Sequence, residues 1–375
     1  MSTSLTNKLP RRILILGCGG FIGSHLIKRL LADSTSKSHI TGIDLTSDKI
    51  KPYLGHKKFS FFTLDIHNNI ALRTHIKQSD VVISLAAICN PALYNTQPLR
   101  VIDANYTGQS FVVKLCAELD KWLIQFSTSE VYGKTAVSVS GQKRSDSVKK
   151  SEYILKEEST PLILGPIAAQ RWTYACAKQL LERLVFAYSQ ESNLKYTIVR
   201  PFNFIGPQMD FIPGIDGEGI PRVLACFMDA LLFEKPLQLV DGGKNKRVFT
   251  YIDDAIDAII RILQQPQKAQ GKIFNIGNPA NEIDIAGLAT LMKSIYLKLR
   301  PDLKQKNIRT ITVAAEKFYG KGYDDSDRRV PAIANAKKLL GWRPKTDLKS
   351  ALTLTIQSYI DQYAPAVFQS TGRCR

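Results

Sequence analysis

The amino-terminal segment constrains the fold more than any other stretch of the chain. Residues 12–16 are mostly apolar, glycines follow at Gly17, Gly20 and Gly23, and residues 21–30 have an amphipathic pattern. This order predicts a buried strand, a tight turn and a helix. Glycines in the turn let a pyrophosphate approach the amino terminus of the helix, where free N–H groups and the helix dipole favour anions. The segment therefore predicts a dinucleotide-binding site.

The next predicted strand, residues 39–44, identifies the dinucleotide. It ends in Asp44, which lies 21 residues after Gly23. A carboxylate at this place accepts hydrogen bonds from the ribose hydroxyls and repels a 2′-phosphate, so we expect NAD rather than NADP. The alternative is that Asp44 is an ordinary turn aspartate.

Predicted strands and helices alternate along most of the chain. The remaining strands are expected at residues 59–65, 80–89, 121–126, 195–200 and 272–276, and helices near residues 98–119 and 168–190. Alternation that starts from a nucleotide-binding turn is typical of the α/β class with a doubly wound parallel sheet, the Rossmann fold.

Two later intervals break this alternation, and 375 residues exceed what a single core usually holds. We therefore expect two parts. The NAD-binding Rossmann domain would comprise residues 1–203 plus 236–278, and a smaller C-terminal α/β substrate-binding lobe would comprise residues 204–235 plus 279–375. Residues 136–159, rich in Ser, Lys and Gly, are expected to form a surface loop over the cleft.

Composition excludes several other classes of protein. The chain is 44% hydrophobic and 22% charged, and no segment approaches the roughly 20 apolar residues of a membrane span. The six cysteines, at positions 18, 89, 116, 176, 226 and 374, are scattered and form no Cys-x-x-Cys pair. This usage predicts reduced thiols in a cytoplasmic protein, with neither a disulfide framework nor a metal site.

The net charge of +18 raises the question of a nucleic-acid partner. The lysines and arginines are spread out, and their clusters, such as residues 143–144, 149–150 and 337–338, are short. No nucleic-acid motif accompanies them, so we expect a solvated basic surface and neither a nucleic-acid nor a membrane partner.

Tyr174 and Lys178 supply the first candidate chemistry. Residues four apart on a helix lie on one face, one turn from each other. A free phenol titrates near pH ~10, and a nearby ammonium favours the phenolate, so the pair predicts a tyrosine with a lowered pKa that accepts protons. By itself this spacing favours an exposed helix that has no catalytic role.

The stretch after the predicted strand at 121–126 adds a second group of polar side chains. Ser127, Thr128 and Ser129 are hydroxyl residues, and Glu130 follows them. Together with the glycine turn and Tyr174/Lys178, in this order, these residues resemble the extended short-chain dehydrogenase/reductase family that acts on nucleotide sugars. The resemblance runs over nearly the whole chain.

Within that family, Ser129-Glu130 resembles the UDP-glucuronate decarboxylase branch, whereas sugar-nucleotide 4,6-dehydratases carry Asp-Glu at this place. Further stretches are similar to the decarboxylase domain of the bacterial aminoarabinose (polymyxin-resistance) enzymes and, more closely, to the plant UDP-apiose/UDP-xylose synthases. They are residues 86–91, 94–96, 174–179, 200–207, 209–216, 221–227, 241–247 and 319–329. Those synthases carry a cysteine in place of Ser129, and a cysteine there is implicated in ring contraction.

The resemblance implies NAD-dependent oxidation of UDP-glucuronate at C4, followed by loss of the carboxylate. Tyr174 would act as base with Lys178 beside it, and Thr128 and Ser129 would hydrogen-bond the sugar. Glu130 would orient the ring or, through a water molecule, handle the proton. Arg329 is carried over as the residue that faces the carboxylate or donates a proton to C5, although Arg328 could take this place instead. Cys89, retained from the family, either takes part in the chemistry or packs as a small apolar residue.

The resemblance also assigns binding residues. The predicted cofactor contacts are Gly17, Gly20, Phe21, Ile22, Gly23, Asp44, Asp65, Ile66, Leu85, Ala86, Ala87, Asn105, Tyr174, Lys178 and Pro201. The predicted substrate contacts are Arg171, Asn203, Arg222, Lys246 or Arg247, and Tyr323. A homodimer is expected through the helices near residues 98–119 and 168–190.

Several alternatives stay open from the sequence. The product could be UDP-xylose, UDP-apiose or released UDP-4-keto-pentose. A UDP-hexose 4-epimerase of the same family is the nearest rival enzyme. A dinucleotide-binding relative without turnover and a nucleic-acid-binding relative are the alternatives that are not enzymes.

Overall fold

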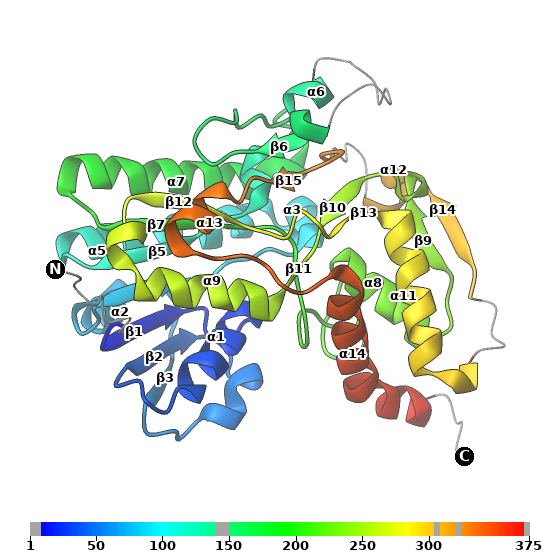
Figure 1. The fold of residues 1–375 in the computed structure, drawn as a ribbon, viewed down its shortest axis with the longest axis horizontal. Helices are drawn as coiled ribbons and strands as arrows, with labels where there is room; N and C mark the ends of the chain where they lie inside the picture. Colours follow the sequence, from blue (N-terminus) through cyan, green and yellow to red (C-terminus); the bar gives the residue numbers. More distant parts are fainter. Residues whose placement is uncertain (1–8, 140–149, 304–307, 320–323, 371–375) are drawn as a thin grey trace.

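The computed structural model describes residues 9–139, 150–303, 308–319 and 324–370. Its centre is a parallel sheet of seven strands in the order β12-β7-β5-β4-β1-β2-β3 (Figure 1). The strands are β1 (Arg12–Leu16), β2 (His39–Asp44), β3 (Phe59–Thr63), β4 (Val81–Ser84), β5 (Trp122–Phe126), β7 (Tyr196–Pro201) and β12 (Lys272–Ile276). This confirms the predicted doubly wound α/β fold.

Helices cover both faces of this sheet, which explains why its central strands are apolar on both sides. On one face, α1 (Phe21–Ala32) packs against α9 (Ile252–Gln264), and on the other, α5 (Gly108–Glu118) packs against α7 (Thr173–Ser192). In Figure 1, α7 and α9 lie on opposite sides of the strands. Alternate residues of β1 divide accordingly: Ile13 and Ile15 join one core cluster, Leu14 and Leu16 the other.

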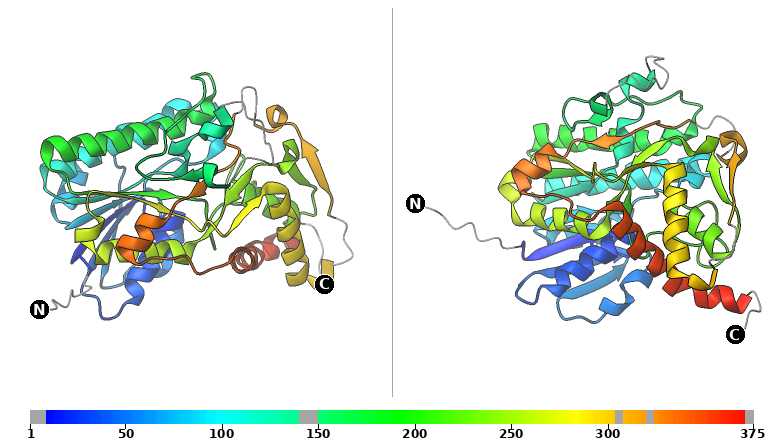
Figure 2. Two further views of the ribbon diagram at one scale, coloured as in Figure 1. Left: turned by 45° about the horizontal axis from the view of Figure 1, so that its top comes forward. Right: turned by 45° about the vertical axis from the view of Figure 1, so that its right-hand side comes forward.

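A smaller lobe adjoins the sheet, on the right in Figure 1. It contains α8 (Val223–Leu232), α11 (Ile285–Leu299), α12 (Ala315–Tyr319), and the parallel pair β9 (Leu237–Val240) and β14 (Thr310–Val313). The last helix, α14 (Leu348–Ser370), packs along α11 and α8, as Figure 2 shows from two directions.

The remaining helices and strands are short. The short helices are α2 (Asn69–Lys77), α3 (Pro91–Thr96), α4 (Pro98–Ile102), α6 (Ala136–Val139), α10 (Pro266–Ala269) and α13 (Ala334–Leu340). The short strands pair as β6 (Ile154–Leu155) with β15 (Val330–Pro331), β8 (Phe204–Ile205) with β11 (Thr250–Tyr251), and β10 (Lys246–Val248) with β13 (Glu282–Asp284).

Three elements differ from their sequence predictions. The strand predicted at 80–89 ends at Ser84, because the chain then turns over the glycine loop. The helix predicted near 98–119 is α4, a π-helical turn at Asp103–Thr107, and α5. Part of the predicted loop 136–159 is ordered as α6 and β6, while residues 140–149 lie outside the described residues.

The interval 236–278, which the sequence analysis gave to the sheet domain, is divided in the structure. Its first strand, β9, pairs with β14 of the lobe, whereas α9 and β12 belong to the sheet and its covering layer. Conversely, α13 lies in the carboxy-terminal third of the chain and packs against β12 and α9. Both differences are long-range pairings, which the local hydrophobic pattern does not reveal.

A buried ion pair fastens α7 to the sheet. Arg200 of β7 donates from Nε and Nη2 to the two carboxylate oxygens of Glu182 at 2.9 and 2.6 Å, and from Nη1 to the Tyr132 hydroxyl at 2.8 Å. Both charged side chains are almost fully buried. The pair therefore positions the helix that carries Tyr174 and Lys178.

We expect Glu182→Ala to lower the free energy of unfolding by about 3 kcal/mol, because it leaves the Arg200 guanidinium buried without its partner. Chemical denaturation measures this change. Asp120→Asn is the matched control, since it breaks the exposed Lys195–Asp120 pair and should cost at most about 0.5 kcal/mol. Equal losses of unfolding free energy in both variants would contradict the stabilising role of the buried Arg200–Glu182 pair.

Candidate functional site

The glycine turn is shaped to receive a group close to its backbone. Gly17 has φ +80°, and a Cβ there would lie 2.5 Å from the amide nitrogen of Ala86. A Cβ on Gly23 would lie 2.5 Å from the Gly17 carbonyl oxygen. Gly20 is the N-cap of α1, and the first two residues of that helix, Phe21 and Ile22, line the main cavity.

Asp44 lies beside this turn, at the carboxyl end of β2. Its Oδ2 accepts a hydrogen bond from the Gly19 amide at 2.8 Å, and its Oδ1 accepts one from Leu45 at 2.7 Å. A carboxylate beside a helix amino terminus, with no room for side chains in the intervening loop, fits the ribose and pyrophosphate of a dinucleotide.

The other predicted cofactor residues lie on the loops after β3 and β4. Leu85, Ala86 and Ala87 follow β4 directly, and Leu85 and Ala87 line the cavity. Asn105 is fully buried beneath this loop, and its side-chain amide donates to the carbonyls of Ile88 and Val101, each at 2.9 Å. Asn105 therefore supports the loop, and its own Oδ1 has no hydrogen-bond partner among the described residues.

Asp65 and Ile66 occupy the turn after β3. The Asp65 carboxylate accepts a backbone hydrogen bond from His67 at 2.9 Å and contacts the His67 ring nitrogen Nδ1 at 2.7 Å. Hydrogen bonds from His67 lower the pKa of Asp65. Because Asp65 is engaged with His67, it shapes this turn in addition to any role toward an adenine ring.

The main cavity has a volume of about 1070 Å³ and opens at the carboxyl ends of the strands. Tyr174, only 6% exposed, lies in its wall and stacks on Tyr94 with ring centroids 5.3 Å apart and an angle of 10° between the planes. Lys178 is 2% exposed and donates from Nζ to the Phe126 carbonyl at 3.2 Å. Pro201 lines the same cavity at the end of β7.

Burial controls the ionisation of Tyr174 and Lys178. It raises the pKa of Tyr174 well above its usual value, with Cys89 and Glu130 adding to the rise and a hydrogen bond with Thr128 opposing it. Burial also lowers the pKa of Lys178 to about 8. The pKa of Tyr174 is thus shifted opposite to the predicted direction, because desolvation outweighs the contacts that favour the phenolate, such as the Thr128 hydrogen bond.

The hydroxyl run lies at the carboxyl end of β5. Thr128 caps a 3-10 turn, Ser129–Tyr132, and accepts a hydrogen bond from the Glu130 amide at 3.1 Å. Ser127, Thr128 and Ser129 all line the cavity, and the Ser127 hydroxyl is buried with no partner among the described residues. Thr128 thus has the backbone role that it would have in a purely structural strand end, while also facing the cavity.

Glu130 makes a two-pronged ion pair with Arg171, with N···O distances of 2.5 and 2.7 Å. Burial alone would raise the pKa of Glu130, but the guanidinium groups of Arg171 and Arg329 outweigh it and the pKa is lowered. Arg171 also lies over the rings of Tyr94 and Trp172 at 5.8 Å each. Glu130 is therefore an ionised carboxylate whose two oxygens are both engaged.

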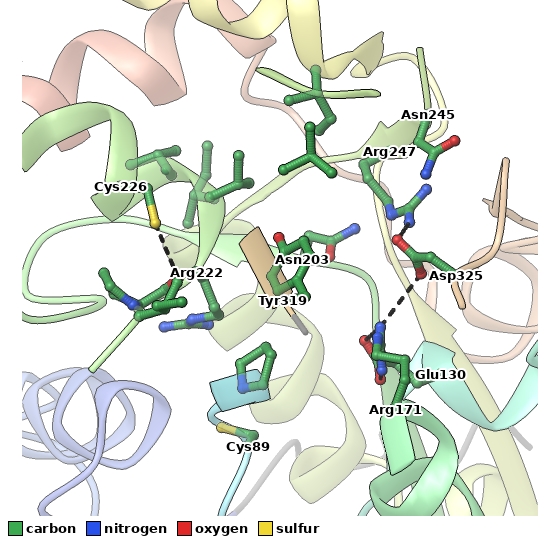
Figure 3. A pocket seen from close by; sticks show the side chains of 18 of the residues that line it. Cys89, Glu130, Arg171, Asn203, Arg222, Cys226, Asn245, Arg247, Tyr319 and Asp325 are labelled. Carbon is green, nitrogen blue, oxygen red and sulfur yellow. Dashed lines mark hydrogen bonds and ion pairs between the residues drawn. The ribbon is translucent and has the colours of Figure 1, made fainter. Parts of the chain in front are cut away.

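Asp325 extends this ion pair into a cluster. Its carboxylate forms ion pairs with Nη2 of Arg247 at 2.5 Å and with Nη2 of Arg171 at 3.5 Å, which Figure 3 marks with dashed lines. Against the cost of burial, Arg247, Arg171 and Arg329 lower the pKa of Asp325 to about 2. The cluster thus holds three guanidinium groups, of Arg171, Arg247 and Arg329, against two carboxylates, which leaves one positive charge.

Arg329 carries the unbalanced part of this charge. It is 3% exposed, its Nη2 lies 3.7 Å from Glu130, and its Nε and Nη1 have no hydrogen-bond partner among the described residues. Burial and the neighbouring Arg247 lower its pKa to about 10. Buried N–H groups without partners on a charged side chain fit an anionic ligand in the cavity.

The structure decides between Arg328 and Arg329. Arg328 points away from the cavity, pairs with Glu282 at 2.6 and 2.7 Å, and lies over the Tyr153 ring. Arg329 lines the cavity. Successive residues face opposite sides where the chain is extended next to β15, and this alternation separates the two arginines.

Cys89 does not pack as a small apolar residue, which was one of the two roles that the sequence allowed. The structure places it on the loop after β4, where it is exposed and lines the cavity. Cys226 of α8 lines the same cavity and donates to the Pro221 carbonyl at 3.2 Å. Figure 3 shows both sulfur atoms on the side of the view away from Glu130 and Asp325.

Most predicted substrate residues face the cavity. Asn203 lies between β7 and β8 and donates to the Val248 carbonyl at 2.8 Å, and Arg222 bonds Asp210 at 3.0 Å and the Met209 carbonyl. Arg247 faces the cavity, while Lys246 is exposed and outside its lining, so of these two only Arg247 is placed to contact a ligand there. Tyr323 lies outside the described residues.

Comparison with known proteins identifies the family. The model of the NAD dependent epimerase/dehydratase family matches residues 13–277. The chain belongs to this family. Its coenzyme is NAD, which agrees with the glycine turn and Asp44.

The UDP-D-apiose/UDP-D-xylose synthase of Oryza sativa subsp. japonica is 48% identical over 96% of this chain and 91% of its own length. UDP-D-apiose/UDP-D-xylose synthase 1 of Arabidopsis thaliana is 46% identical over 97% and 95%.

A solved structure of the same fold supports this membership. The PbgP3 protein of Burkholderia pseudomallei superposes with a TM-score of 0.80 and 34% identity, covering 96% of this chain and 98% of its own. The UDP-glucuronic acid 4-epimerase of Bacillus cereus superposes with a TM-score of 0.72 and 24% identity, covering 94% and 100%. At that identity it shows the shared fold alone.

Several cavity residues of this family member were missed from the sequence. Tyr94 and Asp325 lay within stretches that showed the resemblance, yet nothing local marked Tyr94 as a stacking partner or Asp325 as a bridge between arginines.

Within the described residues, no helix has both the length and the hydropathy to cross a bilayer. Nor does any group of His, Cys, Asp or Glu there suit a metal ion.

We expect Asp44→Asn to weaken NAD binding about tenfold and to improve NADP binding, because the variant loses a charged hydrogen-bond acceptor and the repulsion of a 2′-phosphate. Dissociation constants from coenzyme titrations measure both effects. Asp33→Asn, beyond the far end of α1, is the control and should match the unchanged protein. An unchanged preference for NAD in Asp44→Asn would remove Asp44 from the ribose site.

Proposed function

We propose that the chain catalyses the NAD-dependent oxidative decarboxylation of UDP-glucuronate through a UDP-4-keto intermediate. The observation that carries this proposal is Arg329, a buried guanidinium with two nitrogens that have no hydrogen-bond partner among the described residues, in a cluster that bears one excess positive charge. A carboxylate on the substrate would supply the missing partner. The relatives at 46–48% identity are named as UDP-D-apiose/UDP-D-xylose synthases, which accords with an acidic sugar nucleotide.

The first step removes hydrogen from C4 of the sugar. NAD, when bound, accepts the hydride from this carbon. Tyr174 takes the proton from the C4 hydroxyl, and Thr128 and Ser129, in the same wall of the cavity, hydrogen-bond the sugar. Lys178, four residues after Tyr174 on α7, stabilises the phenolate with its positive charge.

The second step follows from the position of the carboxylate. After oxidation at C4, the carboxylate is β to a carbonyl, so breaking the C–C bond releases carbon dioxide and leaves an enolate that is then protonated at C5. Arg329 holds the carboxylate of the substrate. The fixed positive charge of Arg329 then stabilises the enolate that remains on the sugar after carbon dioxide has left. Arg171 fixes the Glu130 carboxylate, whose oxygens can each accept a further hydrogen bond, so Glu130 can orient the sugar ring.

The lobe would hold the nucleotide. Asn203 and Arg222 are carried over as contacts of the uracil and the diphosphate, with Arg247 assisting, and all three line the same cavity as Tyr174. On this proposal, the sheet domain binds NAD and the lobe binds the sugar nucleotide. A neutral UDP-hexose, the substrate of a 4-epimerase, would leave Arg329 without a partner.

The product can be UDP-xylose, UDP-apiose or UDP-4-keto-pentose. Ser129 and Cys89 both line the cavity, where the related synthases carry two cysteines. Incubation with UDP-glucuronate and NAD, followed by separation of the nucleotide products, distinguishes the three. If carbon dioxide is not released, the assignment fails.

We also infer a cytoplasmic homodimer. Leu99 and Ile102 of α4 and Leu180 and Phe186 of α7 are exposed, and these two helices pack side by side. Adjacent exposed apolar side chains mark interaction surfaces. Light scattering should give a mass twice that of the chain, and a mass equal to that of the chain would contradict the inference.

We expect Arg329→Met to lower carbon dioxide release at least about 100-fold and to weaken UDP-glucuronate binding about tenfold, because the variant loses charge-assisted hydrogen bonds to the carboxylate. Binding of UDP-glucose, which lacks the carboxylate, should not change. Turnover assays and isothermal titration measure these effects. Arg261→Met, which breaks the Arg261–Asp257 pair on α9, is the control. Normal decarboxylation by Arg329→Met would refute the proposed role.

The rate of oxidation should rise with pH, because the raised pKa of Tyr174 leaves it protonated near neutrality and only the phenolate accepts the proton. The Lys178 ammonium, present below its pKa of about 8, eases this ionisation. Lys178→Met should therefore slow oxidation below about pH 8, where the ammonium is charged, and change the rate less at higher pH, where Lys178 is already neutral. Single-turnover NADH formation between pH 6 and 10 tests this, with Tyr174→Phe as the inactive reference. Superimposable profiles would exclude the electrostatic role of Lys178.

A further inference from the structure

Arg329 is held in place by its backbone more than by its own side-chain bonds. Its Nε and Nη1 have no partner among the described residues, and its Nη2 is 3.7 Å from Glu130. The place of its guanidinium therefore depends on how residues 324–331 are fastened. After Arg329, strand β15 pairs with β6, and Arg328 is bonded to Glu282. Before Arg329, the Asp327 carbonyl accepts a hydrogen bond from the Lys246 amide at 2.9 Å, and the side chains of two adjacent aspartates add further bonds.

These two aspartates turn to different neighbours. Asp325 faces the arginines of the cavity, as Figure 3 shows. Asp324 faces Trp172: its Oδ2 accepts a hydrogen bond from the indole Nε1 at 3.0 Å and an ion pair from Lys134 at 2.7 Å. The side chain of Asp324 is 26% exposed, whereas Trp172 is 3% exposed.

Trp172 connects this bond to the catalytic helix. It directly follows Arg171, which holds Glu130, and it precedes Tyr174 by two residues at the start of α7. The bond between Asp324 and Trp172 thus joins the segment that carries Arg329 to the element that carries the base. These residues are 152 positions apart in the chain.

Gly165 packs directly on this bond. A Cβ at this position would lie 2.6 Å from Oδ2 of Asp324 and would also collide with the indole Nε1 of Trp172. Any side chain there would push the two groups apart. The contact is therefore formed by three separate segments of the chain, of which Gly165 contributes only backbone.

We propose that Asp324, through the indole of Trp172, is a positioning residue that sets where Arg329 meets the acidic group of the substrate. It thereby contributes to the choice of an acidic over a neutral sugar nucleotide. The inference rests on the proposed function, in which Arg329 binds the carboxylate. Asp324 lies in the cavity wall, and its carboxylate bonds Trp172 and Lys134 instead of the clustered arginines.

The experiment compares UDP-glucuronate with UDP-glucose in Trp172→Phe and Asp324→Asn. Trp172→Phe removes the indole N–H together with the five-membered ring that carries it, and Asp324→Asn removes the charge. Dissociation constants are measured by titration in the presence of NADH, so that no oxidation occurs. We expect UDP-glucuronate to bind about tenfold more weakly to both variants and UDP-glucose to bind as before. Gly165→Ala, which alters neither bonding side chain, should reproduce the loss.

Trp122→Phe is the matched control. The Trp122 indole donates to the Thr197 hydroxyl at 3.1 Å and is equally buried, but it lies at the amino end of β5, away from the cavity. This variant should lose stability without changing the preference between the two ligands. The inference is overturned if Trp172→Phe and Asp324→Asn keep the preference of the unchanged protein, or if Trp122→Phe loses it equally.

The result also separates the inference from the proposed function. If the unchanged protein releases carbon dioxide from UDP-glucuronate and prefers it over UDP-glucose, the proposed function stands whatever the variants do. If the unchanged protein does neither, both ideas are wrong. Thermal melts of each variant ensure that only folded protein is compared, and Gly165→Ala decides the question if the two side-chain variants do not fold.

Discussion

An imbalance of buried charge defines this site. Burying a guanidinium is costly unless a carboxylate or another acceptor compensates it. Two carboxylates, Glu130 and Asp325, compensate two of the three arginines, and Arg329 is left with N–H groups that have no partner among the described residues. A protein that keeps such a group in a cavity has a place for an anion built into its electrostatics.

One helix brings the elements of the site together. Helix α7 carries Tyr174, Lys178 and Glu182, and the turn before it carries Arg171 and Trp172. Glu182 fastens the helix to the sheet through Arg200, and Arg171 and Trp172 fasten two other segments to it. The chemistry expected of Tyr174 therefore depends on ion pairs and hydrogen bonds that do not touch the reacting atoms.

The same burial that assembles the site sets its chemical state. Tyr174 is harder to ionise than a free phenol and Lys178 is easier to deprotonate than a free amine, because each loses hydration. The pKa values of the Asp325 and Glu130 carboxyl groups are lowered, because the charges of their arginine partners outweigh the effect of burial. Groups within one cavity thus titrate in different ranges, which allows a base and a fixed carboxylate to coexist.

The sequence by itself determined the fold class, the glycine turn, the Asp44 position, the Tyr174/Lys178 spacing and the family, because these depend on local periodicity and on motifs within a few residues. Only the tertiary structure decided that Arg329 and not Arg328 faces the cavity, that Arg247 and not Lys246 lines it, and that Cys89 is exposed there. It also reversed the expected direction of the Tyr174 pKa. The reason is physical: burial and charge pairing join residues such as Arg171 and Asp325, 154 positions apart, and no local pattern records those contacts.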